Sequence, residues 1–535
     1  MTNISRQCLF LDWLNVYEAG GMEITLDPAR ISPQGRKMID SNAKKWGIHV
    51  DTSGHGMKRS CVPFGVKVTI EKARKSHPWL HEDQPWEKCI SSLTVIHEEG
   101  KYRCWYAVTF PKPLEAEKSA EQVFHEGRQM DMGMEGLCYA ESSDGVNWVK
   151  PSIGLFSFNG STDNNIVSNL QMGPGSVFRD PSAPPEERYK GFVWDTLPGR
   201  GSGWLGFGLY GAVSPDGLRW TRLPDPLIPE FCDTQNVVYW DEQKRRYVGY
   251  FRGGMCGRAI RYAETDDFRK WPSPEVIAHP SGLLDGPCDD YYSNGFTMYP
   301  EDPLVKLIFC SIYHHDSDLL DVRLGLTHNG CEIWTEKGAG AACKVINWVS
   351  LDPVLEPGKL GTWDCGQLYP SPNMVRLPDG TLAVPYHGSN YTHEGYCYGH
   401  YYENYSEDSS AYAWAIWDDG RLAGIEAEDY GEFWTKSFVC TGGPIEINAR
   451  TKKAGSVEVE LWASKSEEMR EFLGVPIKAI PGYTFDECIP FRGDELWTPL
   501  QWKDKENLSQ LKGQKVHLRF RLAGAKIFGY RVLTK

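Results

Sequence analysis

Four acidic residues stand at the start of segments rich in the aromatic and β-branched residues that favour strands. They are Glu87 in PWEKC, Asp233 in CDTQNVVYW, Asp290 in DGPCDDYYSNGF and Asp364 in GTWDCGQLYPSP. Carboxylates that converge from separate parts of a chain repel one another, which raises the pKa of some of them. Such a set supplies the acid and the base that cleavage of a glycosidic bond requires. We take Asp233, Asp290 and Asp364 as the candidate catalytic acids, with Glu87 completing the cluster.

Polar and aromatic residues near these segments are candidates for holding a substrate. Asn236 is close enough in sequence to Asp233 to fix its orientation through a hydrogen bond. Arginine and histidine suit the hydroxyl or carboxylate groups of a sugar, and tryptophan suits its apolar face. The candidates of these types are Arg252, Arg258, Arg323, His314, His315, His393, Trp86, Trp105 and Trp363. For each of them, a structural hydrogen bond or a place in the core is the alternative interpretation.

A short turn motif recurs four times and indicates how these residues are positioned. Its copies are SSDGVNW (Ser142 to Trp148), SPDGLRW (Ser214 to Trp220), TDDFRKW (Thr265 to Trp271) and THNGCEIW (Thr327 to Trp334). Ser, Asp and Gly favour tight turns because short polar side chains bond to the backbone and Gly tolerates positive φ. The tryptophan that follows is expected to pack between neighbouring sheets.

A strand with aromatic residues precedes each turn, and a fifth copy of this strand follows them. The five segments are GKYRCWYAV (Gly100 to Val108), ERYKGFVW (Glu187 to Trp194), RRYVGYFR (Arg245 to Arg252), VKLIFCSIY (Val305 to Tyr313) and GTLAVPYHG (Gly380 to Gly388). The turn tryptophans are 72, 51 and 63 residues apart, slightly more than the ~40 to 50 residues of compact propeller repeats. The pattern predicts a five-bladed β-propeller with inner strands beginning near residues 90, 175, 236, 294 and 372. Unrelated hairpins of a β-sandwich are the alternative.

The pattern changes in the last quarter of the chain. PIEINARTKKAGSVEVELW (Pro444 to Trp462) and QKVHLRFRLAGAKIFGYRVL (Gln514 to Leu533) alternate apolar and polar residues, as strands with one buried face do. We therefore predict an all-β protein with a propeller over residues 85–428 and a small β-sandwich over 429–535. Residues 1–84 are predicted to contribute a ring-closing strand, CLFLDWLNV (Cys8 to Val16).

Composition excludes several partners. The chain of 535 residues has a formal net charge of −14 and lacks a cluster of Lys and Arg that could neutralise phosphates, which argues against nucleic acid and anionic membranes. It has neither a signal peptide nor a stretch of ~20 apolar residues that could span a membrane, and its 15 Cys are scattered. We therefore expect a cytoplasmic protein that requires no cofactor. The sequence leaves open whether the channel holds a metal ion and whether the protein is a homo-oligomer.

Three segments in order resemble those of a known superfamily. SVFRDPSAPPEERYKGF, DTQNVVYWDEQKRRYVGYFR and LGTWDCGQLYPSPNMV, followed by a small sandwich, are similar to the five-bladed propeller glycoside hydrolases of the arabinanase and fructosidase superfamily. The resemblance covers roughly residues 85 to 535. It implies cleavage of terminal furanosides or related sugars by carboxylates of the inner strands. One departure is Asp180 in FRDP, which aligns with the turn residue Asp241 and is therefore expected to be structural.

The leading functional hypothesis is an exo-acting glycoside hydrolase that removes a terminal sugar, a furanoside included, from a short saccharide. A glycoside phosphorylase or a lyase is the alternative among enzymes, because Arg and His could hold phosphate. A carbohydrate-binding propeller without catalysis is the alternative among binding proteins. Release of reducing sugar and dependence on phosphate would distinguish the three.

Overall fold

The computed structural model divides the chain into two compact units, which we call the propeller unit (Lys72–Asp418) and the C-terminal unit (Met1–Glu71 with Asp419–Lys535). The structure describes residues 4–16, 32–35, 37–38, 41, 63–111, 135–173, 175–200, 206–233, 235–254, 257–280, 285–286, 289–300, 302–327, 347–394, 410–464, 476–505 and 507–534. No helix in this part of the chain has the length and hydropathy of a membrane span.

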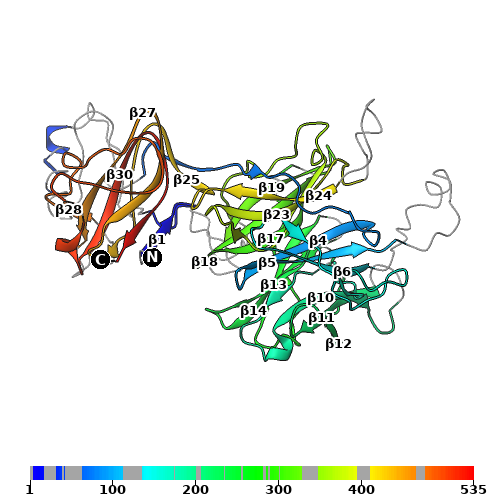
Figure 1. Ribbon diagram of the computed structural model, residues 1–535. Coiled ribbons are helices and arrows are strands. Elements are labelled where there is room, and N and C mark those ends of the chain that lie inside the picture. Colours follow the sequence, from blue (N-terminus) through cyan, green and yellow to red (C-terminus); the bar gives the residue numbers. More distant parts are fainter. Residues whose placement is uncertain are drawn as a thin grey trace. The chain divides into compact units, whose positions relative to one another are not determined.

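The propeller unit consists of five antiparallel sheets (Figure 1), which confirms the predicted all-β propeller. The first blade contains β4 (Cys89–Glu98), β5 (Lys101–Thr109), β6 (Glu135–Ser142), β7 (Trp148–Val149) and β8 (Ile166–Ser168). The second contains β9 (Phe178–Arg179), β10 (Tyr189–Thr196), β11 (Phe207–Ser214) and β12 (Thr221–Ile228). The third contains β13 (Val237–Asp241), β14 (Arg246–Gly253), β15 (Ala259–Thr265) and β16 (Glu275–Ala278).

The last two blades follow the same order. The fourth contains β17 (Asp289–Tyr299), β18 (Asp302–His314), β19 (Leu319–Thr327) and β20 (Asn347–Trp348). The fifth contains β21 (Gln367–Pro370), β22 (Val375–Arg376), β23 (Leu382–Ser389), β24 (Ser410–Trp417) and β3 (Arg74–Lys75). The inner strands β4, β9, β13, β17 and β21 begin within about five residues of the predicted positions.

The recurring turns make hydrogen bonds to neighbouring blades. In the second copy, the backbone N–H of Gly217 donates to Ser214 Oγ at 2.9 Å, and the indole of Trp220 donates to the Gly217 carbonyl at 3.0 Å. The same carbonyl accepts a 2.6 Å bond from the indole of Trp105 in the first blade. Gly217 has φ +78°, and a Cβ there would lie 2.6 Å from the Trp105 ring, so this position requires glycine. Trp105 is thus a buried residue that joins the first and second blades by a hydrogen bond, and its predicted role as a sugar platform is wrong.

The first turn repeats this arrangement with the fifth blade. The indole of Trp414 donates to the Gly145 carbonyl at 2.8 Å, and Trp79 stacks on both Trp148 and Trp414 with ring centroids 4.5 and 4.9 Å away. The third turn carries Phe268 where the others have Gly, and its Trp271 indole donates to the Phe268 carbonyl. The fourth predicted turn, Thr327 to Trp334, lies outside the described residues apart from Thr327.

The ring is closed by a strand from the N-terminal part of the chain, but not by the one predicted. Strand β3 pairs with β24 through Lys75 and Ala415, so the chain ahead of the first blade supplies the outer strand of the last. The segment predicted for this role begins within β1 (Ile4–Leu9), which pairs with β30 (Lys515–Leu533) in the C-terminal unit. Alternation of apolar and polar residues identified a strand there, but it does not reveal which sheet edge that strand joins.

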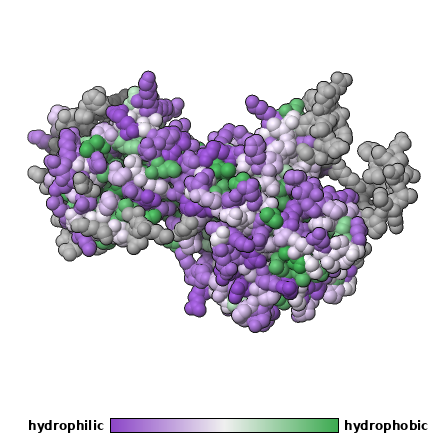
Figure 2. Space-filling view, viewed as in Figure 1, coloured by the Kyte–Doolittle hydropathy of each residue, from purple (hydrophilic) through white to green (hydrophobic). Residues whose placement is uncertain are grey.

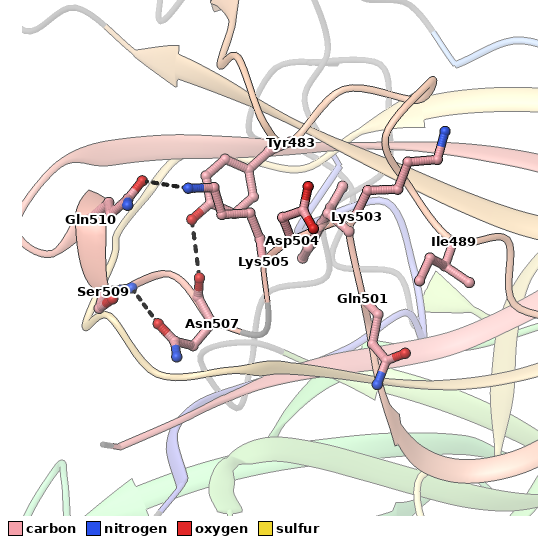
Figure 3. A pocket seen from close by; sticks show the side chains of 10 residues that line it. Tyr483, Ile489, Gln501, Lys503, Asp504, Lys505, Asn507, Ser509 and Gln510 are labelled. Carbon is pink, nitrogen blue, oxygen red and sulfur yellow. Dashed lines mark hydrogen bonds between the residues drawn. The ribbon is translucent and has the colours of Figure 1, made fainter.

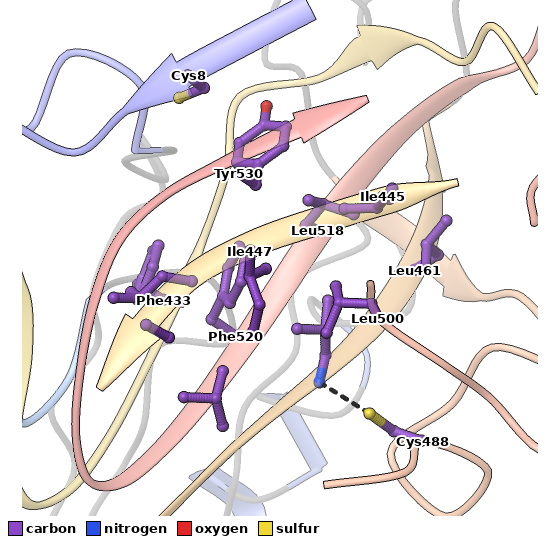
Figure 4. Close-up of a cluster of buried hydrophobic side chains, with 14 of the residues drawn as sticks. Cys8, Phe433, Ile445, Ile447, Leu461, Cys488, Leu500, Leu518, Phe520 and Tyr530 are labelled. Atoms are coloured by element: carbon purple, nitrogen blue, oxygen red, sulfur yellow. Dashed lines mark hydrogen bonds between the residues drawn. The ribbon is translucent and has the colours of Figure 1, made fainter. Parts of the chain in front are cut away.

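The C-terminal unit is built on one eight-stranded sheet. Its strands are β1 and β30, with β2 (Lys67–Ile70), β25 (Ala423–Trp434), β26 (Phe438–Val439), β27 (Ile445–Ser464), β28 (Pro476–Ala479) and β29 (Asp494–Pro499). Because β25 pairs with β30, the unit begins earlier than the predicted boundary at residue 429. Phe433 and Phe520 stack at 5.0 Å within its apolar core (Figure 4). A division of this sheet into the two layers of a sandwich stays a prediction.

The surface of both units is mainly hydrophilic on the face shown in Figure 2. The C-terminal unit also has a pocket of about 580 Å³ (Figure 3). Its lining residues are Tyr483, Ile489, Gln501, Trp502, Lys503, Asp504, Lys505, Asn507, Ser509 and Gln510. Both of its lysines are engaged, since Lys505 donates to Gln510 at 3.0 Å and Lys503 to the Asp486 carbonyl at 2.9 Å.

A buried ion pair links the third and fourth blades and should contribute strongly to stability. Lys306 Nζ lies 2.6 Å from Asp241 Oδ2, and the side chains are only 4% and 3% exposed. Replacing Lys306 by Met leaves a buried carboxylate without its cation, which we expect to lower the free energy of unfolding by about 3 to 5 kcal/mol. The measurement is urea unfolding followed by tryptophan fluorescence.

The matched control removes a cation from an exposed pair. Lys101 and Glu141 are 57% and 33% exposed, so Lys101→Met should change the free energy of unfolding by less than about 1 kcal/mol. The double variant Asp241→Asn with Lys306→Met should recover part of the loss, because no unpaired charge is then buried. Equal effects of Lys306→Met and Lys101→Met would contradict the assignment.

Candidate active site

The five inner strands surround the propeller axis and begin at the same end of it. Gly175 and Asn236, just before β9 and β13, form a parallel bridge, and Val177 donates its backbone N–H to Thr94 Oγ1 of β4. On the opposite side, the Gln235 amide donates to the carbonyls of Asn294 at 3.3 Å and Pro370 at 3.1 Å. Contacts of β17 with both β13 and β21 complete the order. We call the end of the axis where these strands begin the mouth.

Side chains from three blades meet at the mouth around Tyr292 of β17. The guanidinium carbons of Arg252 and Arg258, both from the third blade, lie 4.3 and 4.7 Å from its ring centroid. From the fifth blade, the rings of His393 and Tyr369 lie 4.6 and 5.6 Å away. Five side chains from three blades can make these contacts only near the axis, so the predicted residues Arg252 and His393 belong to one cluster.

Asp233 lies in this cluster with its carboxylate partly open to solvent. The side chain is 31% exposed, and Oδ2 is 3.6 Å from Arg252 Nη2, which is an ion pair longer than a direct hydrogen bond. Asn236 holds the segment in place, because its Nδ2 donates to the Asp233 carbonyl at 2.9 Å while its Oδ1 accepts the Arg252 backbone N–H at 3.0 Å. The predicted link between Asn236 and Asp233 therefore acts through the backbone.

Asp290 is buried and fully engaged. Its Oδ1 accepts the Arg258 backbone N–H at 2.9 Å, and its Oδ2 accepts Arg258 Nη1 and His315 Nε2, both at 2.8 Å. Burial raises the pKa of the carboxyl, but the bonds from His315 and Arg258 together lower it by more than burial raises it. The pKa therefore lies below its ordinary value. Asp290 thus stays ionised and is poorly suited to donate a proton.

His393 is held in its neutral form. Its Nδ1 lies 3.2 Å from the Tyr369 hydroxyl, and Tyr369 in turn donates to Gln367 Oε1. Burial and the positive charges of Arg258 and Arg252 lower the pKa of the imidazole to about 4. A neutral imidazole among hydroxyl groups can both donate and accept hydrogen bonds, as recognition of a sugar requires.

Glu135 is an acid of the mouth that the sequence did not point to. It begins β6 in the first blade, and a Cβ placed on Gly173 would lie 3.0 Å from its Oε2 and 3.5 Å from Ser91 Oγ. Ser91 and Gly173 precede Thr94 and Val177, which are bonded to each other at the axis. Burial raises the pKa of the Glu135 carboxyl. The one sequence signal was Gly173 itself, whose missing side chain leaves room for this carboxyl.

Glu87 lies within the first blade, in a structural ion pair. The side chain is completely buried, with Oε2 at 2.7 Å from Lys150 Nζ and Oε1 accepting the Tyr106 hydroxyl at 2.6 Å. Its Oε2 also accepts the backbone N–H groups of Asp83 and Gln84. Glu87 thus caps a turn and pairs with a buried lysine, and the structure does not bring it into the predicted cluster of acids. Trp86 beside it is likewise a core residue whose indole donates to Asn165.

Asp364 is held by the outer part of the fifth blade. Lys75 Nζ of β3 lies 2.6 Å from its Oδ2, and the Tyr386 hydroxyl donates to the same oxygen at 3.1 Å. Trp363 stacks on Tyr386 with centroids 5.8 Å apart. These partners belong to β3 and β23, so the structure does not bring Asp364 and Trp363 together with the side chains around Tyr292.

We expect Asp364→Asn to lower stability and leave turnover within about threefold of the parent, because it removes the charge that pairs with Lys75 and not a group of the mouth. The measurement pairs initial rates at saturating substrate with thermal unfolding of the same preparation. A loss of turnover by about 10²-fold or more, as expected for a catalytic acid, would show that Asp364 is a catalytic residue after all.

Arg323 and Asp180 also form buried ion pairs within or between blades. Arg323 Nη1 lies 2.6 Å from Asp285 Oδ1, with the two side chains 8% and 0% exposed. Asp180 Oδ2 lies 2.8 Å from Lys190 Nζ and accepts the Tyr247 hydroxyl at 2.7 Å. Asp180 therefore resembles Asp241 in bonding to a buried lysine, as its alignment with that turn residue predicted. Within the described ranges, no three His, Cys, Asp or Glu side chains are grouped as metal ligands would be.

No protein-family model matches the sequence, and no curated protein is similar to it. Several solved structures are similar in fold. A glycosyl hydrolase from Bacteroides ovatus is 12% identical with a TM-score of 0.41, over 66% of this chain and 95% of that chain. A thermostable family-43 glycoside hydrolase is 13% identical with a TM-score of 0.37, over 63% and 93%. An N-acetylgalactosamine deacetylase from F. plautii is 15% identical with a TM-score of 0.38, over 66% and 94%. Likenesses of this size assign no role to any residue of this chain.

Proposed function

We propose that the protein is a glycoside hydrolase whose catalytic pair is Glu135 and Asp233. The observation that carries this proposal is the contrast between two carboxyl groups at the mouth. Burial raises the pKa of the half-buried Glu135 carboxyl, whereas Asp233, which is also half-buried, lies beside the guanidinium of Arg252. Two carboxyl groups in such different surroundings are the combination that glycosidic bond cleavage uses.

The roles follow from these surroundings. Glu135, whose pKa is raised by burial, donates a proton to the leaving oxygen, while the Asp233 side chain activates water or attacks the sugar. Arg252 stabilises the Asp233 carboxylate, and Asn236 holds its backbone. His393 and Tyr369 provide hydrogen bonds for the hydroxyl groups of the sugar.

We further propose that the enzyme removes a terminal sugar. The Gln235 side chain, two residues after Asp233, crosses from the third blade to carbonyls of the fourth and fifth. The Gln235 side chain thereby obstructs the propeller axis next to the mouth. This favours binding of the end of a saccharide chain over binding of a chain that runs through the axis. A chain end bound in this way presents its last glycosidic bond to the acids.

The test is incubation with a panel of plant and algal oligosaccharides, followed by chromatography of the products. Release of monosaccharide from the start of the reaction supports an exo-acting hydrolase, and release of shorter oligosaccharides contradicts the exo mode. Sugar phosphate formed only with added phosphate would identify a phosphorylase, and an unsaturated product a lyase. Binding without any product would leave a carbohydrate-binding propeller.

A further inference from the structure

A guanidinium and an imidazole of the mouth converge on a single carboxylate oxygen. Arg258 Nη1 from the third blade and His315 Nε2 from the fourth each lie 2.8 Å from Asp290 Oδ2. They are therefore less than about 6 Å from one another. Because Asp290 is also bonded to the Arg258 backbone, the carboxylate fixes both groups in place and acts as a positioning residue.

The Arg258 and His315 side chains pack against aromatic rings on one side and are open to solvent on the other. The Arg258 guanidinium lies against the rings of Tyr292 and Tyr313 at 4.7 and 5.6 Å, and the His315 ring lies 4.2 Å from that of Tyr313. Yet the Arg258 and His315 side chains are 19% and 42% exposed, whereas Asp290 is only 4% exposed. With Nη1 and Nε2 committed to Asp290, Arg258 Nη2 and His315 Nδ1 are the nitrogens that can bind a ligand.

The acids around this pair are already engaged. Asp233 is the counter-ion of Arg252, and Asp290 is shared between Arg258 and His315. Asp318 accepts the Tyr313 hydroxyl and the backbone N–H of Glu394. The remaining nitrogens of the Arg258 guanidinium and the His315 imidazole are thus suited to the oxygens of an anion.

We propose that the mouth recognises an anionic group on the sugar, a uronate carboxylate or a sulfate ester, through Arg258 and His315. The inference rests on the proposed function for the bond that is cleaved, but binding of the anion can be tested without cleavage. A guanidinium and an imidazole held close together by one carboxylate oxygen can each bond to an oxygen of such a group, and a neutral hydroxymethyl group would leave one of the donors without an acceptor.

The binding test is calorimetric titration of the full-length protein with neutral monosaccharides, the matching uronates and the matching sulfate esters. We expect the anionic sugars to bind at least tenfold tighter than their neutral counterparts. Preference for uronates or for sulfate esters identifies which source supplies the anion. His315→Gln and Arg258→Gln should each weaken binding of the anionic sugar about 10- to 100-fold, the loss expected for a charge-assisted hydrogen bond, and weaken binding of neutral sugars by much less.

The control is Arg246→Gln, which removes an arginine that is 46% exposed and paired with Glu264 on the third blade. It should bind every sugar as the parent does. His315→Gln changes an exposed residue, so it keeps the test decisive even if Arg258→Gln fails to fold. Equal affinity for neutral and anionic sugars, or no binding of anionic sugars, overturns the inference. Anion binding that depends on Arg258 in a protein that cleaves nothing would uphold the inference and refute the hydrolase.

Discussion

Asp233→Asn should lower turnover by about 10² to 10⁴, the loss expected when a catalytic acid or base is removed. The amide keeps the shape of the carboxylate but cannot accept a proton or attack a sugar. The fold should survive, because Asp233 is 31% exposed and Asn236 holds its backbone and not its side chain. The measurement is the initial rate at saturating concentration of a saccharide that the parent cleaves.

The matched control is Asp163→Asn. Asp163 is an exposed acid in the STDNNIV segment, upstream of the second blade, and its replacement should leave turnover unchanged. Thermal unfolding of both variants separates loss of catalysis from loss of fold. If Asp233→Asn turns over at a rate close to that of Asp163→Asn, Asp233 is not a catalytic residue.

The propeller was predictable because its signals are local. Each of the three turns that the structure describes in full contains its own hydrogen-bonding partners, as Ser214, Gly217 and Trp220 illustrate. Five copies of the aromatic strand, four of them followed by that turn, then gave the number of blades. The strand that closes the ring gave no such signal, since β3 has two residues and pairs with β24 more than 300 positions away. Pairing between distant segments depends on the assembled ring and not on the local pattern.

The candidate site was predictable only in part, for a similar reason. The start of an inner strand indicates which end of the axis a residue occupies, and this was sufficient for Asp233 and Asp290. It does not indicate whether a side chain faces the axis or the interior of its own blade, where Glu87 and Asp364 meet Lys150 and Lys75. Glu135 escaped detection because it begins the third strand of a blade and reaches the mouth beside Gly173.

Glu135→Gln should remove the proton donor, and the fall in kcat/KM at high pH should disappear with it. In the parent, kcat/KM should fall as pH rises through the raised pKa of Glu135, because the ionised carboxylate has no proton to give. Glutamine cannot ionise, so this alkaline decline should disappear. The measurements are complete pH profiles of both proteins.

Comparison of leaving groups separates proton donation from a structural role of Glu135. A sugar alkoxide needs a proton to depart, so kcat for an oligosaccharide should fall by about 10² to 10⁴, whereas a 4-nitrophenyl glycoside, whose phenolate departs readily, should lose far less. Glu141→Gln is the control, because Glu141 lies on the same strand β6 but bonds to Lys101 and Tyr139. Equal losses with both leaving groups, together with an alkaline decline that persists, would show that Glu135 supports the fold of the mouth and that another group donates the proton.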